Sequence, residues 1–198
     1  LAAAQARQDK FQEGIHLTNL ARVTMRLGDY KLALEQVHKS LEMKRSLNDL
    51  TGVGFALFYR GLIAIYTDQF DEAASALAEA LEAWSTVPKN ERLMSYYHYG
   101  AGLLALAQGQ YTAAQPALEK ALDLSAKLEL RAEKIENLSA LSQAKLGAGE
   151  LQAALADSTQ AVRLLASQKD VEEVQMVYLN HYRVLKAAND VQPEKYLQ

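Results

Sequence analysis

One sequence pattern occurs four times along this chain, and it limits the possible folds more than any other feature. Each copy ends a helix-like segment at a tight turn and continues with a large apolar residue. Small or apolar residues then follow three, seven, ten and eleven positions later. The residues directly after the four turns are Tyr30, Phe70, Tyr111 and Leu151, which lie 40, 41 and 40 positions apart. This spacing indicates an array of repeats, in which each unit buries its apolar face against its neighbours.

Each copy predicts two antiparallel helices, helix A before the turn and helix B after it, because apolar residues recur every three or four positions on both sides. Residues that favour turns or stop helices, such as Asn48, Asp49 and Pro88, separate the copies. The predicted pairs of helix A and helix B are 11–27 with 30–47, 50–67 with 70–85, 91–108 with 111–128, and 132–146 with 151–167, followed by a helix over 171–188.

These helix pairs predict a single all-α domain over residues 1–198, built as an α-solenoid of antiparallel pairs. Its full units are expected at about 10–48, 49–89, 90–130 and 131–169. Residues 1–9 align one period ahead with the end of a helix B, so we expect them to be the tail of a preceding unit. Residues 170–198 are expected to form a partial fifth unit, in which Pro193 would start another helix B.

Composition narrows the possible classes of function. The formal net charge of −3 gives no general attraction to nucleic acids or anionic membranes. The chain has no cysteine, which excludes disulfides and cysteine-ligated metals and fits a cytoplasmic location. No apolar run reaches the roughly 18 residues that a membrane-spanning helix needs.

The repeated positions resemble those of the tetratricopeptide repeat family. That family has a small residue inside helix A, glycine near the turn, an aromatic residue after it, and two alanines in helix B. The matching residues are Gly61 and Gly102 in helix A, with Ala21 and Ser142 as substitutes; Gly28, Gly109 and Gly149 near the turn; Tyr30, Phe70 and Tyr111 after it; and Ala33, Ala73, Ala114, Ala154, Ala80, Ala121 and Ala161 in helix B. Asp68, Leu151 and Ser40 depart from the pattern.

The resemblance implies a right-handed superhelix and a non-catalytic role in binding other proteins. A period of about 40 residues is longer than the ~34 of the common repeat. Repeats of this length are similar to those of kinesin light chain, of bacterial signalling ATPases and transcription activators, and of peptide-sensing regulators of Gram-positive bacteria.

Sequence motifs for catalysis or metal binding are absent. The four histidines, His16, His38, His98 and His181, fall in different helices without a second histidine four positions away. The chain has no phosphate-binding glycine loop and no nucleophile elbow. We therefore predict no enzyme activity, no metal and no cofactor.

The family resemblance places ligand contacts on the concave face, along helix A of each unit. The candidate positions are Asn19 and Arg22 in the first unit, Phe58, Tyr59, Leu62 and Tyr66 in the second, Tyr96, Tyr99 and Leu103 in the third, and Ser139 and Gln143 in the fourth. Thr18 belongs to the same row. In members that grip a terminal carboxylate, Lys, Asn and Arg form a clamp, and only Asn19 and Arg22 match it here.

The helix predicted at 50–67 is apolar on nearly every face, and such a helix must be buried by its own fold or by a partner. Either a tight superhelix covers its rings, or they form an apolar groove for a helix or an extended peptide. Tyrosine favours the groove slightly, since its hydroxyl group tolerates a half-wet surface.

The primary hypothesis is therefore a module that binds a protein or peptide partner, without direct contact to nucleic acid or membrane. A second hypothesis is a ligand- or peptide-sensing regulatory segment of a larger bacterial signalling or transcription protein. A third is self-association, with a homodimer formed through the end units.

Overall fold

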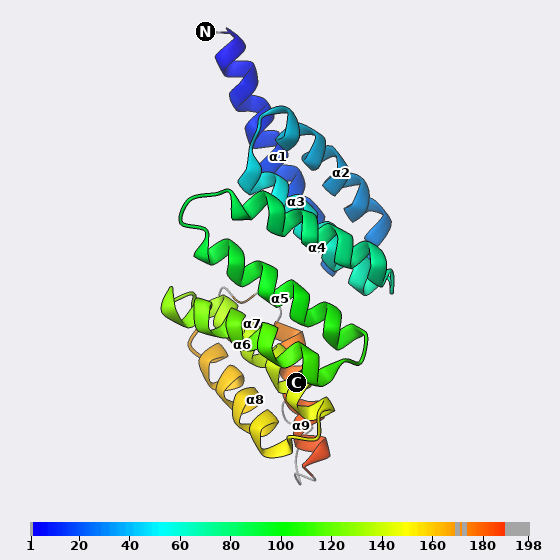
Figure 1. Cartoon of the computed structure of the whole chain (residues 1–198), viewed down its shortest axis with the longest axis vertical. Helices are drawn as coiled ribbons and strands as arrows, with labels where there is room; N and C mark the ends of the chain where they lie inside the picture. Colours follow the sequence, from blue (N-terminus) through cyan, green and yellow to red (C-terminus); the bar gives the residue numbers. More distant parts are fainter. Residues whose placement is uncertain (1, 169–170, 172–173, 189–198) are drawn as a thin grey trace. The chain divides into compact units, whose positions relative to one another are not determined.

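The computed structural model describes residues 2–168, 171 and 174–188, and this part of the chain folds into α-helices without a strand (Figure 1). The helices are α1 (Ala2–Arg26), α2 (Tyr30–Ser46), α3 (Leu50–Tyr66), α4 (Phe70–Ser85), α5 (Glu91–Ala107), α6 (Tyr111–Lys127), α7 (Arg131–Gly147), α8 (Leu151–Leu165) and α9 (Val174–Ala187). The predicted fold class, an all-α solenoid of antiparallel helix pairs, is confirmed. The helix predicted to start at Pro193 lies outside the described residues.

Most helices begin and end within two residues of the predicted positions, but the first helix does not. A break was expected near residues 9–10, whereas α1 is one helix of 25 residues. No glycine or proline occurs between residues 2 and 13, and the side-chain amide of Gln5 donates a hydrogen bond of 2.8 Å to Asp9 one turn later. The first two turns of α1 therefore continue the same helix.

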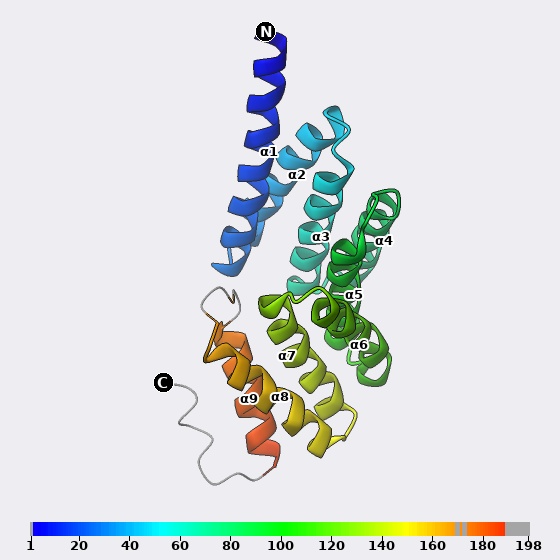
Figure 2. The same cartoon turned by 90° about the vertical axis from the view of Figure 1, so that its left-hand side faces the viewer.

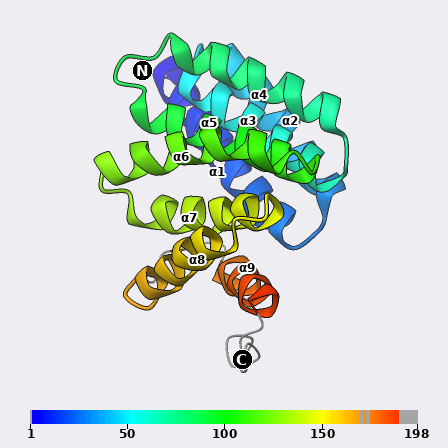
Figure 3. The same cartoon turned by 60° about the horizontal axis from the view of Figure 1, so that its bottom comes forward.

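The chain divides into two compact units, and each is described by itself. Unit 1 (Leu1–Leu93) contains α1 to α4, and unit 2 (Met94–Gln198) contains α5 from Met94 onward and α6 to α9. In unit 1, α3 packs against α4, α2 and α1 (Figure 2). In unit 2, α7 packs against α6, α8 and α9 (Figure 3).

Close packing inside the helix pairs depends on the small residue of helix A. A Cβ atom placed on Gly102 of α5 would lie 2.5 Å from Leu118 of α6, and one placed on Gly61 of α3 would lie 3.1 Å from Leu77 of α4. Glycine thus lets the leucine of helix B touch the backbone of helix A, and both leucines are buried.

The turns between helices share one backbone conformation. Gly28, Gly109 and Gly149 are left-handed, with φ of +71° to +83°, and Asp68 takes the same place with φ of +57°. Each of these turns closes its helix with two hydrogen bonds, one donated by the left-handed residue and one by the next residue, as Gly109 N to Leu106 O (3.0 Å) and Gln110 N to Ala105 O (2.8 Å) show. Glycine favours this turn, but the fold imposes it on aspartate too.

Among the described residues, three turns from a helix B to the next helix A use the left-handed conformation as well. Asn48, Lys89 and Glu129 have φ of +54° to +56°. Asn48 and Pro88 give local turn signals at the first two positions, whereas no turn-favouring residue marks Glu129.

Trp84 belongs to the buried apolar core of unit 1. Its side chain on α4 is fully buried, and its ring meets Phe55 of α3 edge-on at 5.3 Å between centroids. The indole Nε1 donates a hydrogen bond of 3.2 Å to the carbonyl of Thr51. Gly54 leaves the space for the ring, because a Cβ there would overlap Nε1.

Two apolar clusters form among the described residues of unit 2. Ala114 and Leu118 of α6 pack with Ala140, Leu141 and Ala144 of α7. The second cluster joins α7, α8 and α9, and its buried members are Ile135, Leu138, Ala161, Leu165, Val171 and Val177. Side chains of α7 thus contribute to both clusters.

Candidate binding surface

In unit 1 the predicted contact residues separate into an accessible group and a buried group. Asn19 is exposed, Arg22 and Tyr59 are half-buried, and Tyr66 keeps 39% of its surface exposed. Phe58 and Leu62 are buried, with 2% and 6% exposed. Thr18 is buried as well, and its hydroxyl group lies 2.7 Å from that of Ser40 on α2.

Phe58 is buried by the fold's own aromatic residues. Its ring centroid lies 6.1 Å from that of Trp84 and 5.4 Å from that of Tyr59. The apolar helix α3 therefore turns part of its aromatic face into the core of unit 1 and leaves Tyr59 and Tyr66 nearer its surface.

Tyr66, the last residue of α3, stacks on Tyr30, the first residue of α2. The ring centroids are 6.0 Å apart and the planes are tilted by 18°. Both rings are partly accessible, so the pair exposes aromatic surface at the end of α3 and the start of α2.

In unit 2, the predicted residues on α5 face α7. The hydroxyl group of Tyr96 donates a hydrogen bond of 3.1 Å to the carboxylate of Glu133, and Tyr99 and Leu103 pack against the cluster that α6 and α7 share. All three predicted residues remain half-buried.

Ser139 and Gln143 of α7 are bound by α9. Asn180 donates a hydrogen bond of 3.0 Å to the Ser139 hydroxyl group, and Gln143 donates one of 3.2 Å to the carbonyl of Asn180. Ser139 is only 4% exposed, while Gln143 is half-buried. These two residues thus connect helices of unit 2, and Gln143 keeps part of its surface accessible.

Sequence reasoning missed the two residues of α9 in this polar cluster, Asn180 and Arg183. Arg183 is exposed, and its guanidinium group donates a hydrogen bond of 3.4 Å to the amide oxygen of Asn180. Asn180 lies 41 residues after Ser139, one repeat period later, and that register could have revealed it.

His98 lies on α5, and its side chain is half-buried. Burial lowers its pKa below the usual 6.5, and the positive charge of Lys120 on α6 lowers the pKa further. The imidazole is therefore neutral at neutral pH.

A shallow pocket of about 490 Å³ lies in unit 2 between the α6–α7 turn and the end of α8. Glu129, Arg131, Lys134 and Ser167 are among its lining residues. Because both charge signs line it, the pocket selects neither anions nor cations.

Within the described residues, no group of three or more histidine, aspartate or glutamate side chains is arranged to hold a metal ion. In the same part of the chain, no helix is long and apolar enough to cross a membrane.

Several solved structures have a similar fold. Aspartyl phosphate phosphatase F from Bacillus subtilis matches 98% of this chain with a TM-score of 0.72 and 14% identity. A putative kinesin light chain from Podosopora anserina, with nearly identical TPR-like repeats, matches 92% of this chain and 90% of its own. Its TM-score is 0.59 and its identity 17%, and a point variant of the same protein gives 0.60 and 18%. This chain spans about half of the phosphatase chain (51%).

No curated protein matches the sequence at a significant level. Two family models do match it, both described as tetratricopeptide repeat, over residues 12–86 and 95–128. Together they cover more than half of the chain. The chain belongs to the tetratricopeptide repeat family. In this tetratricopeptide repeat protein the matched residues include most of α1, all of α2 to α4, most of α5 and all of α6, and α7 and α8 continue the same period.

Proposed function

We propose that this tetratricopeptide repeat protein is a non-catalytic module that binds a peptide or helix of a partner protein along its helix-A rows. The proposed contacts are Asn19, Arg22, Tyr59 and Tyr66 in unit 1 and Tyr96, Tyr99, Leu103 and Gln143 in unit 2. The other predicted residues, Phe58, Leu62 and Ser139, are buried, so they would hold the contact residues in place and would not touch the partner themselves. A cytoplasmic location is part of the proposal.

The observation that carries the proposal is the partial exposure of tyrosines on successive A helices. Tyr59 and Tyr66 on α3 and Tyr96 and Tyr99 on α5 all keep accessible surface. Tyrosine combines a large apolar ring with a polar hydroxyl group and few rotatable bonds, so it is enriched at protein interfaces.

The test is selection from a library of displayed peptides, followed by titration of a selected peptide with Tyr59→Ala and Tyr66→Ala variants. Leu32→Ala is the matched control, since Leu32 is 42% exposed on α2, a B helix. We expect each tyrosine variant to weaken binding about tenfold or more, as truncation of an interface hot spot does. Equal affinities for the variants and the control would overturn the proposal.

A second candidate function is a peptide-sensing regulatory segment of a larger signalling protein. Its support is a similarity of fold: nearly the whole of this chain matches about half of a bacterial phosphatase chain. Self-association is a third candidate. Sedimentation over a concentration series tests it, since a reversible dimer abolished by Tyr59→Ala or Tyr99→Ala would favour self-association over a foreign partner.

A further inference from the structure

The pocket of about 490 Å³ in unit 2 lies between two segments that are distant in the sequence. One is the turn from α6 to α7 together with the first turn of α7, and the other is the end of α8. Both segments lie at the same end of the unit (Figure 1 and Figure 3). The volume falls within the roughly 300–1,000 Å³ of small-molecule sites. None of the contacts of the proposed function lines this pocket.

Three charged side chains line the pocket, and they do not neutralise one another. Glu129 comes from the turn, and Arg131 and Lys134 come from the first turn of α7. Glu129 and Arg131 are exposed, and Lys134 is half-buried. Within the described residues none of the three forms an ion pair, although opposite charges share one pocket. Such a pocket can attract a ligand that carries both charges.

The helix ends at the pocket add to this separation of charge. Helix α7 begins here, and its N-cap Leu130 makes no side-chain hydrogen bond to the first turn. A helix N-terminus carries partial positive charge, so it adds to the field of Arg131 and Lys134. Helix α8 ends here, and a helix C-terminus carries partial negative charge. The start of α7 therefore favours an anionic group, and the end of α8 together with Glu129 favours a cationic group.

Apolar side chains supply much of the remaining lining. Ile135 is fully buried, and Leu130 and Leu164 are half-buried. Ser125, the other buried residue of the lining, already donates a hydrogen bond of 2.9 Å to the carbonyl of Leu122. An aliphatic group in the pocket therefore meets apolar surface, and Ser125 does not need the ligand as a partner.

We propose that this pocket binds a free amino acid with an aliphatic side chain. The carboxylate of the ligand lies at Arg131, Lys134 and the start of α7, and its ammonium group lies towards Glu129 and the end of α8. Charge-assisted hydrogen bonds are roughly twice as strong as neutral ones, and the aliphatic side chain buries surface against Ile135 and Leu164. A simple anion or cation satisfies only one side of the pocket. This site is separate from the helix-A rows of the proposed function, so each proposal can fail without the other.

The test is a titration of the isotope-labelled full chain with L-leucine, followed by nuclear magnetic resonance. We expect saturable shifts of the amide signals of the pocket residues, with a dissociation constant of about 1 mM or lower. N-acetyl-L-leucine lacks the ammonium group, L-leucinamide lacks the carboxylate, and free glycine lacks the side chain. Each should bind about tenfold or more weakly, because each loses one of the three contacts.

Two variants assign the charged contacts. Lys134→Gln should weaken the binding of L-leucine about tenfold and leave that of L-leucinamide unchanged, since this analogue has no carboxylate. Glu129→Gln should weaken L-leucine binding similarly and leave that of N-acetyl-L-leucine unchanged. The matched controls are Arg163→Gln and Glu119→Gln, because these side chains are exposed on α8 and α6 and do not line the pocket. Circular dichroism verifies that all four variants fold.

Three outcomes would overturn the proposal. The first is no saturable binding at about 10 mM L-leucine, ten times the expected constant. The second is equal affinity for L-leucine and both singly charged analogues, which would show that the pocket does not recognise the two charges. The third is binding that Lys134→Gln and Glu129→Gln both leave unchanged, which would place L-leucine elsewhere on the chain.

Discussion

The ammonium group of Lys44 on α2 lies 4.6 Å from the ring centroid of Phe11 on α1. The same group forms an ion pair of 2.9 Å with Asp49, whose other carboxylate oxygen accepts a hydrogen bond from Gly52 N and caps α3. Lys44 is only 3% exposed, and Gly14 of α1 leaves it space. One buried lysine therefore connects three helices of unit 1.

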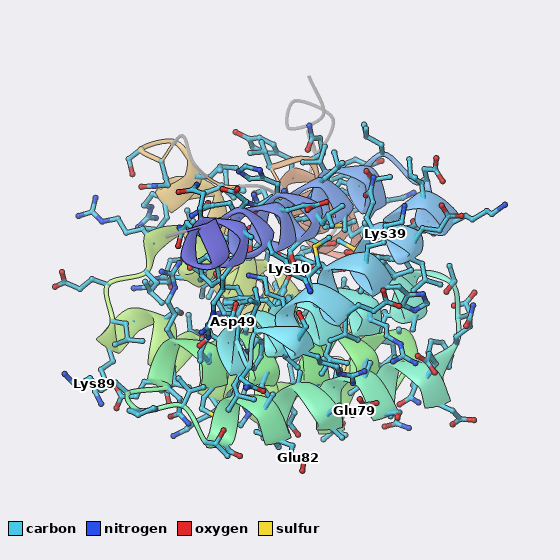
Figure 4. The ribbon with its side chains drawn as sticks, turned by 90° about the horizontal axis from the view of Figure 1, so that it is seen from above. Lys10, Lys39, Asp49, Glu79, Glu82 and Lys89 are labelled. Carbon is cyan, nitrogen blue, oxygen red and sulfur yellow. The ribbon has the colours of Figure 1, made fainter. Side chains whose placement is uncertain are left out.

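We expect Lys44→Ala to lower the free energy of unfolding by about 2 kcal/mol or more, since it leaves the partly buried Asp49 carboxylate without its cation. Lys39→Ala is the control, because Lys39 is exposed on the same helix (Figure 4), and its effect should stay within about 0.5 kcal/mol. Urea denaturation measures both. Equal midpoints for the two variants would show that the buried pair contributes nothing net.

The contact between Gly54 and Trp84 predicts that alanine is harmful at this helical position. Although alanine is a better helix former than glycine by about 1 kcal/mol, the Cβ would overlap the indole ring, and overpacking costs about 1–3 kcal/mol. Gly54→Ala should therefore unfold at lower urea than Gly61→Ala, whose Cβ would lie 3.1 Å from Leu77. Because Trp84 is the single tryptophan, its fluorescence reports the transition. A Gly54→Ala variant as stable as Gly61→Ala would contradict the packing described for this ring.

The left-handed backbone at Glu129 predicts a stabilising change. A residue with a Cβ atom pays roughly 1 kcal/mol in this conformation and glycine does not, so Glu129→Gly should raise the free energy of unfolding by about 0.5–1 kcal/mol. The same change at Glu119, exposed inside α6, should lower it by about 0.5–1 kcal/mol. Thermal unfolding of both variants tests the difference in sign, and a destabilised Glu129→Gly protein would rule out the strain.

The environment of His98 predicts a dependence of stability on pH. Burial and Lys120 hold the pKa of His98 in the folded protein below 6.5, so the unfolded chain takes up the proton first as the pH falls. The contribution of His98 to stability is therefore present above about pH 6.5 and is lost as the pH falls towards the folded-state pKa. Chemical denaturation at a series of pH values should show a weaker loss of stability in His98→Gln than in the unmodified protein. Parallel slopes in the two proteins would exclude His98 as a source of the dependence.

Local patterns in the sequence were enough to predict the repeat, the helix pairs and the family. The apolar period, the glycines of the A-to-B turns and the residue after each turn act within one hairpin, so they can be recognised without tertiary contacts. The helix predicted to begin at residue 11 begins at Ala2 in the structure, because the predicted start rested on alignment to another repeat and not on a local turn signal. The division of the chain into units and the full set of contact residues stay predictions.

The sequence by itself determined which segments are helical and where they turn, whereas the tertiary structure decided which side chains remain accessible. A helix that is apolar all round, such as α3, has no period to separate Phe58 from Tyr59, and it is packing against residues such as Trp84 that buries the first ring more deeply. The bond between Ser139 and Asn180 likewise joins residues 41 positions apart. Burial depends on neighbours that packing brings together across the repeats, and helical periodicity within one segment does not contain that information.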